Sequence, residues 1–128
     1  MTRTETELRF LRAIAERVPA ERVAEVHLFP ALRQGRMETG VAVVAATEDG
    51  GRPDDVAVFT ARYRLAVKGT ERGSWTIDVQ ADADAPLSTV TNVVRGVQRR
   101  SGDETEPTLL SGDDFRALVA VPEPAARS

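Results

Sequence analysis

The chain has 128 residues, a formal net charge of -3 at neutral pH and no cysteine. This length suits one domain with one core, and 41% hydrophobic with 29% charged residues is ordinary for a globular protein. A negative charge disfavours nucleic-acid phosphates, which need clustered Lys and Arg. The lack of cysteine excludes disulfides and thiolate metal sites, so we expect a cytoplasmic protein.

The chain begins with charged residues and has no apolar run long enough for a signal peptide or for a membrane span of about 20 residues. We therefore expect neither a leader nor a membrane partner. Residues 1–128 read as a single domain, with a frayed tail from about residue 120.

A helix is predicted at residues 4–18. Thr4 and Glu7 have the spacing of a capping box, and Pro19 ends the helix. Between them, apolar residues recur at helical spacing on one face: Leu8, Leu11, Ala15 and Val18.

Two strands are predicted next, at residues 23–33 and 39–46, because apolar residues alternate along both. Pro30 makes the first an edge strand, and Gln34–Gly35 suits a two-residue hairpin turn. This turn would set three apolar pairs opposite one another: Leu32 and Met37, Leu28 and Val41, and Val26 and Val43.

A second hairpin is predicted from residues 55–68 and 75–82, apolar on one face and charged on the other. If Val67 lies opposite Trp75, then Arg64 lies opposite Asp78. Val58 is out of phase with the strand that follows it, which predicts a bulge near Phe59.

Helical spacing returns in the segment between Pro86 and Gly102, and Ser111–Asp114 caps a short helix that ends before Pro122. The predicted fold class is α+β. It comprises an N-terminal helix, a four-stranded curved antiparallel β-meander, a helix packed on the sheet and a short C-terminal helix.

We predict no catalytic, cofactor-binding or metal site, and hence not an enzyme. His27 is the sole histidine, too little for a triad or a zinc site with the residues around it. No glycine-rich phosphate loop occurs. The remaining charged clusters suit a solvated strand end or a helix end: Asp78, Asp82 and Asp84, and Arg95, Arg99 and Arg100.

The outward positions of the strand at 39–46 are small or apolar, so both of its faces look buried. With an aromatic opposite them, they form a candidate protein interface: Phe29, Gly40, Ala42, Val44 and Ala46. The partner would be a second copy of the chain or another protein. In the alternative interpretation, a helix of the same chain covers this patch.

Two further functions stay open. One is a small-ligand-binding protein or enzyme, because a curved sheet embraced by helices can enclose a pocket, here between Tyr63, Trp75 and the helix at 87–97. Weak nucleic-acid binding through the arginines is the other, although few aromatic residues are present to stack on bases.

The order of elements resembles that of SecB-type export chaperones over about residues 54–118. The stretches that carry the resemblance are Asp54-Asp-Val, the alternating strand around Arg62, Trp75-Thr-Ile-Asp-Val-Gln80, and Phe115-Arg-Ala-Leu118. The chain differs in having a helix before the first strand and no acidic tail. The resemblance implies an oligomeric chaperone that holds unfolded clients on apolar surface, without ATP or catalysis.

Overall fold

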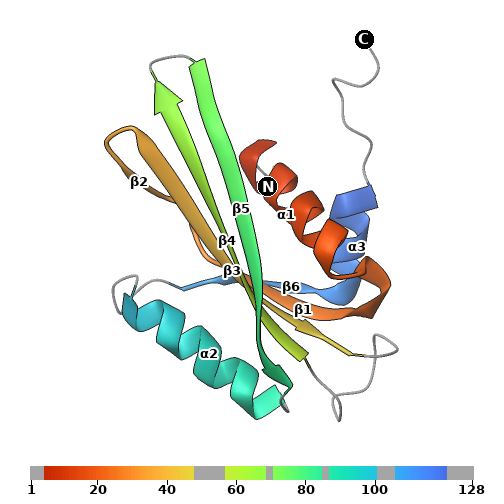
Figure 1. Ribbon diagram of the computed structural model, residues 1–128. Helices are drawn as coiled ribbons and strands as arrows, with labels where there is room; N and C mark the ends of the chain where they lie inside the picture. Colours follow the sequence, from red (N-terminus) through yellow and green to blue (C-terminus); the bar gives the residue numbers. More distant parts are fainter. Residues whose placement is uncertain (1–4, 48–56, 69–70, 85–86, 101–105, 121–128) are drawn as a thin grey trace.

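The computed structural model describes residues 5–47, 57–68, 71–84, 87–100 and 106–120. Within these residues, six strands form one antiparallel sheet in the order β5-β4-β3-β1-β6, with β2 paired to β3 (Figure 1). The strands are β1 (Val23–Leu28), β2 (Leu32–Gln34), β3 (Met37–Ala46), β4 (Ala57–Lys68), β5 (Glu71–Asp84) and β6 (Thr108–Ser111). The fold class is α+β, as predicted.

The helices lie on both faces of this sheet. α1 (Glu5–Arg17) and α3 (Gly112–Ala120) cover one face, and α2 (Leu87–Arg100) lies on the other (Figure 1). A short 3-10 turn, η1 (Ala20–Arg22), joins α1 to β1. The result is three layers, with the sheet between two unequal helical layers.

The sequence located all three helices to within a few residues. The predicted cap Thr4 and the tail from residue 121 lie outside the described residues. At α3 the predicted cap is present, because the Asp114 N–H donates to Ser111 Oγ at 3.1 Å. Arg116 then ties α3 to the chain before β1 by donating to the carbonyl oxygens of Ala20 and Val23, at 3.0 and 3.1 Å.

The expected count of four strands needs correction for two reasons. The first predicted strand is two strands, β1 and β2, separated by residues 29–31, where Pro30 has no N–H to donate to a ladder. The segment Thr108–Ser111, for which no strand was predicted, pairs with β1 as the edge strand β6, so β1 is not the edge strand that Pro30 predicted. Four residues are too few to show a period, so the sequence pattern does not predict this strand.

The register of the first hairpin is also corrected. Gln34 pairs with Met37, so the turn is Gly35–Arg36, and Gly35 takes the positive φ of +59° that such a turn requires. Further along, Val26 pairs with Val44 instead of Val43. A slip of one residue moves every side chain of a strand to the other face of the sheet.

In the second hairpin the predicted faces are correct, although the pairs are not. Leu65 lies opposite Trp75, and Arg62, rather than Arg64, lies opposite Asp78. This shift of two residues preserves which side chains share a face, since side chains alternate with a period of two. The irregularity predicted near Phe59 is present as a register shift between Val58 and Phe59.

Two apolar cores result, one on each side of the sheet. The larger lies under α1 and α3 and is filled by Phe10, Leu11, Ile14, Val26, Val44, Tyr63 and Phe115, among others. The smaller lies under α2 and contains Phe29, Val43, Ala45, Val58, Val90 and Val97. Because β3 contributes to both cores, almost all of its second half is buried.

An aromatic stack centred on Tyr63 joins α1 to the sheet. The Tyr63 ring meets Phe10 edge to face at 4.8 Å between centroids and stacks on Trp75 at 4.9 Å. Arg9 of α1 places its guanidinium 4.4 Å from the centre of the Trp75 ring, a cation–π contact. Tyr63 lies opposite Gly40, and a Cβ at Gly40 would overlap the Tyr63 ring. The stack therefore requires glycine at this position.

We expect Gly40→Ala to lower the free energy of unfolding by about 1–3 kcal/mol, the usual cost of overpacking a dense core. Gly96 supplies the control, since a Cβ there meets nothing within 4 Å and the residue lies inside α2. Gly96→Ala should raise stability by about 0.5–1 kcal/mol through helix propensity. Urea unfolding of both variants measures the two effects.

A double-mutant cycle separates the overlap from other costs at this position. In a Tyr63→Leu background the ring is gone, so Gly40→Ala should cost much less than in the natural sequence. An equal cost in both backgrounds would show that the ring does not occupy the space over Gly40.

Candidate functional site

The five residues predicted as an interface are all buried within this chain. Ala42, Val44 and Ala46 belong to the core under α1 and α3, on the same side as the Tyr63 ring that lies over Gly40. Phe29 faces the other way, into the core under α2. The single outward patch predicted from alternation is therefore not formed, because helices lie on both faces of the sheet. Helices of the same chain cover them.

The pocket predicted between Tyr63, Trp75 and the helix at 87–97 is also corrected. Both aromatic side chains belong to the α1 side of the sheet, where they stack on each other and on Phe10. α2, which contains residues 87–97, lies on the opposite side (Figure 1). The sheet itself separates the two groups.

The Tyr63 hydroxyl donates a hydrogen bond to Glu38 Oε2 at 2.7 Å. Burial of the phenol raises the pKa of Tyr63 well above its ordinary value, and the hydrogen bond and the negative charges of Glu38 and Glu7 act in the same direction. A phenol held in this protonated form is a hydrogen-bond donor that supports the core, and it is a poor base.

α2 is too short to cover its side of the sheet. Its 14 residues span about 21 Å as a helix, whereas the 12 residues of β4 span about 40 Å as a strand. α2 packs on Val43, Ala45 and Val58, towards one end of the strands, and ends at Arg100. Beyond that point, no helix among the described residues lies over the same side of β3 and β4 (Figure 1).

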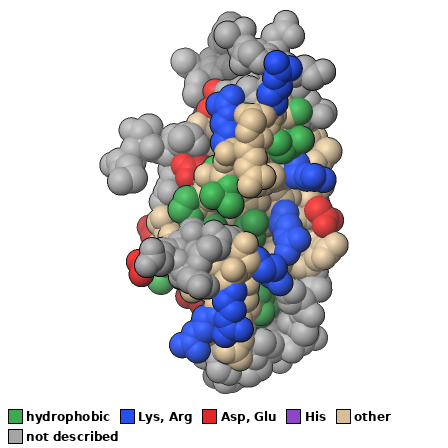
Figure 2. Space-filling model, turned by 90° about the vertical axis from the view of Figure 1, so that its left-hand side faces the viewer, with side chains coloured by type: hydrophobic (Ala, Val, Ile, Leu, Met, Phe, Trp, Pro, Cys, Tyr) green, Lys and Arg blue, Asp and Glu red, His purple; other side chains and the backbone are tan. Residues whose placement is uncertain are grey.

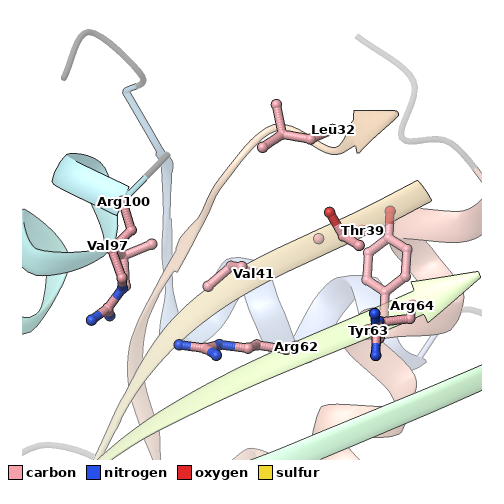
Figure 3. Close-up of a pocket in the computed structure, with 9 residues that line it drawn as sticks. Leu32, Thr39, Val41, Arg62, Tyr63, Arg64, Val97 and Arg100 are labelled. Atoms are coloured by element: carbon pink, nitrogen blue, oxygen red, sulfur yellow. The ribbon is translucent and has the colours of Figure 1, made fainter. Parts of the chain in front are cut away.

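The uncovered part of the sheet is hollowed. A depression of about 400 Å³ lies between β2, β3, β4 and the end of α2. Gly40 and Tyr63, which belongs to the core on the other side of the sheet, also line it. We call the remaining lining residues the open face: Leu32, Thr39, Val41, Arg62, Arg64, Val97 and Arg100. Figure 3 shows Arg62 extending along the sheet towards α2, where Val97 and Arg100 lie, with Leu32 of β2 on the far side of the depression.

A second, smaller hollow of about 250 Å³ continues the first one. It is lined by Met37, Arg64, Ala66 and Thr76, and so shares Arg64 with the larger depression. The strand pairing agrees with this continuity, because Arg64 of β4 lies opposite Thr39 of β3 and opposite Thr76 of β5. Together the two hollows make an elongated surface across β3, β4 and β5.

The open face is basic although the chain as a whole is acidic. Arg62, Arg64 and Arg100 are exposed, and among the described residues none of the three makes an ion pair. Asp78, opposite Arg62 on β5, is the acidic neighbour that the register places on this side. Figure 2 shows this side of the molecule, with Lys and Arg side chains spread over it and apolar side chains between them.

Exposed apolar side chains accompany these charges. Among the described residues, the large apolar side chains that remain exposed are Leu32, at 45%, and Leu109, at 58%. Leu32 pairs with Thr39, and Leu109 pairs with His27, which itself lies opposite Val43. Residues directly opposite share a face, so both leucines lie on the α2 side of the sheet.

The other candidates that the structure describes include His27 and the arginines of α2. His27 Nε2 is buried, has no hydrogen bond and lies 3.4 Å from Glu25 Oε1. Within the described parts of the chain, no three His, Cys, Asp or Glu side chains gather as metal ligands. Arg95 and Arg99 are exposed on α2 and do not line the depression, whereas Arg100 does.

No protein-family model, curated protein or solved structure matches this chain. Among the described residues, no helix is long and apolar enough to cross a membrane.

The elements of the open face were visible separately in the sequence. The outward alternation of Arg62 and Arg64 was predicted correctly, and Arg100 was recognised at a helix end. Nothing in the sequence says that α2 ends beside these arginines, because that depends on how far the helix reaches along the sheet.

The protonation of Tyr63 gives a direct test of the core beside this site. In the unfolded chain a tyrosine loses its proton near pH 10. Folded Tyr63 should keep its proton there, because its pKa is raised. Since Tyr63 is the sole tyrosine, the ultraviolet absorbance of tyrosinate reports it alone.

The raised pKa of Tyr63 also makes the free energy of unfolding depend on pH. Between the two pKa values the folded chain binds a proton that the unfolded chain has lost, so stability falls as the pH rises above about 10. At that pH we expect little tyrosinate absorbance from the folded protein and about half of the full absorbance in urea, where the pKa is near 10. Tyr63→Phe should show a shallower fall in stability. Tyrosinate that forms near pH 10 while the protein stays folded would contradict the buried hydrogen bond to Glu38.

Proposed function

We propose that this chain is a non-enzymatic protein-interaction domain that contacts its partner through the open face. The observation that carries this proposal is the elongated basic hollow that α2 leaves uncovered, with Leu32 exposed beside it. Arginine and large apolar side chains are enriched where proteins meet. The partner is another protein or a second copy of the chain.

A small-ligand site has less support. Such sites bury most of the ligand inside a cavity, whereas this depression opens to solvent along the sheet. Nucleic acid also has less support than a protein partner, because base stacking requires exposed aromatic rings. Tyr63, Trp75 and Phe10 stack together on the far side of the sheet, away from the arginines.

A holding chaperone, as the resemblance to SecB implies, is one version of this proposal. In that version the open face contributes apolar and basic surface to unfolded clients. Light scattering by a denatured client that aggregates on dilution tests it, since the chain should suppress the aggregation without ATP. A Leu32→Asp variant should suppress it less than the natural chain.

The interaction itself is tested by a photoactivatable cross-linking residue at position 32, introduced into the chain in its native cells. We expect covalent adducts with one or a few proteins after illumination, because Leu32 lies at the proposed contact. Position 16 is the control, since Glu16 is exposed on α1, a helix on the opposite face of the sheet. Mass spectrometry identifies the adducts.

Adducts at position 32 that are absent at position 16 would support the proposal. Equal adducts at both positions, or none at position 32, would contradict it. Light scattering of the purified chain at two concentrations then distinguishes a second copy from a different protein.

A further inference from the structure

From the shape and charge of the open face we infer that its occupant is an extended acidic segment of a partner protein, one that also carries aliphatic side chains. This inference rests on the proposed function and names the chemistry of the partner. Three observations carry it: the length of the surface, the apolar side chains along it and the arginines beside them.

The shape of the surface favours an extended chain. The two hollows share Arg64 and follow one another across β3, β4 and β5. An extended segment of about eight residues spans about 26 Å, so it reaches both hollows, and successive side chains point alternately towards and away from the sheet. A helix of the same eight residues would span only about 12 Å.

The apolar floor favours aliphatic side chains at the positions that point inward. Leu32, Val41 and Val97 line the larger hollow, and Met37 and Ala66 line the smaller one. Val97 is almost fully buried, so it forms a firm wall, while Leu32 stays exposed at 45%. Covering Leu32 with an aliphatic side chain removes apolar surface from water.

The positive charge of the three arginines on the open face favours an acidic partner. Arg62 and Arg64 of β4 and Arg100 of α2 line the same depression, and Figure 3 shows Arg62 extending towards α2 with Arg64 further along β4. Guanidinium groups bind carboxylates through two parallel hydrogen bonds, and they stay charged at every physiological pH. No ion pair within the described residues neutralises these three groups. A segment with carboxylates beside its aliphatic residues is complementary to this arrangement.

The test uses a fluorescein-labelled peptide of about eight residues that repeats serine, glutamate, serine and leucine, so that glutamate and leucine share one face of the strand and the length spans both hollows. Fluorescence anisotropy measures its binding to the full chain. We expect saturable binding that weakens about tenfold when the carboxylates are replaced by amides, and that weakens with added salt. Replacing leucine by serine in the peptide should also weaken binding.

Variants of the chain locate the contact. Arg62→Glu with Arg100→Glu should weaken the acidic peptide by about tenfold or more and should create binding to the same peptide with lysine in place of its acidic residues. Arg95→Glu with Arg99→Glu is the matched control, since it changes the net charge equally at exposed residues outside the hollows. This control should bind the acidic peptide almost as the natural chain does. Circular dichroism confirms that both variants fold.

The peptide-binding and cross-linking experiments test the acidic segment and the interaction domain separately. If the peptide does not bind while position 32 still cross-links to a protein, the acidic segment is wrong and the interaction domain stands. If the control pair weakens binding as much as the test pair, the peptide responds to net charge and the inference is wrong. If an oligonucleotide binds the open face and the peptide does not, both proposals are overturned in favour of a nucleic-acid partner.

Discussion

The ring of Tyr63 lying over Gly40 is the contact on which the rest of this structure depends. It joins the centre of the sheet to α1 through Phe10 and sets which face of β4 is the core face. Since side chains alternate along a strand, the residues on either side of Tyr63 must point the other way. Arg62 and Arg64 are those residues, so the packing of one aromatic side chain places two arginines on the face opposite α1.

The second constraint is the mismatch between a short helix and long strands. A helix rises about 1.5 Å per residue and a strand about 3.3 Å, so α2 covers less than the full length of β4 although it has two more residues. Its valines bury one part of the sheet and leave the other part as the open face. The site and the smaller core are thus two consequences of one packing arrangement. This is also why Arg100, the last residue of α2, comes to lie beside the arginines of β4.

Local patterns predicted much of this arrangement. The apolar stripes of the helices and the alternation along the second hairpin assigned the correct faces there, because each pattern has one apolar and one polar side. The first hairpin was different. β3 is apolar or small on both sides, so a register shifted by one residue satisfies the pattern equally well, and Val44 was assigned to the wrong face. β6 was missed because four residues are too short to show a period.

The sequence by itself determined the class of the protein. It established the α+β fold class, and it set which residues alternate together along β4. Only the tertiary structure decided how Val44 and Phe29 are covered and where the uncovered surface lies. The reason is physical: a side chain's direction follows from local backbone geometry, whereas its burial depends on which distant element packs against it. Here the core under α1 and α3 covers Val44, the core under α2 covers Phe29, and the end of α2 leaves the open face uncovered.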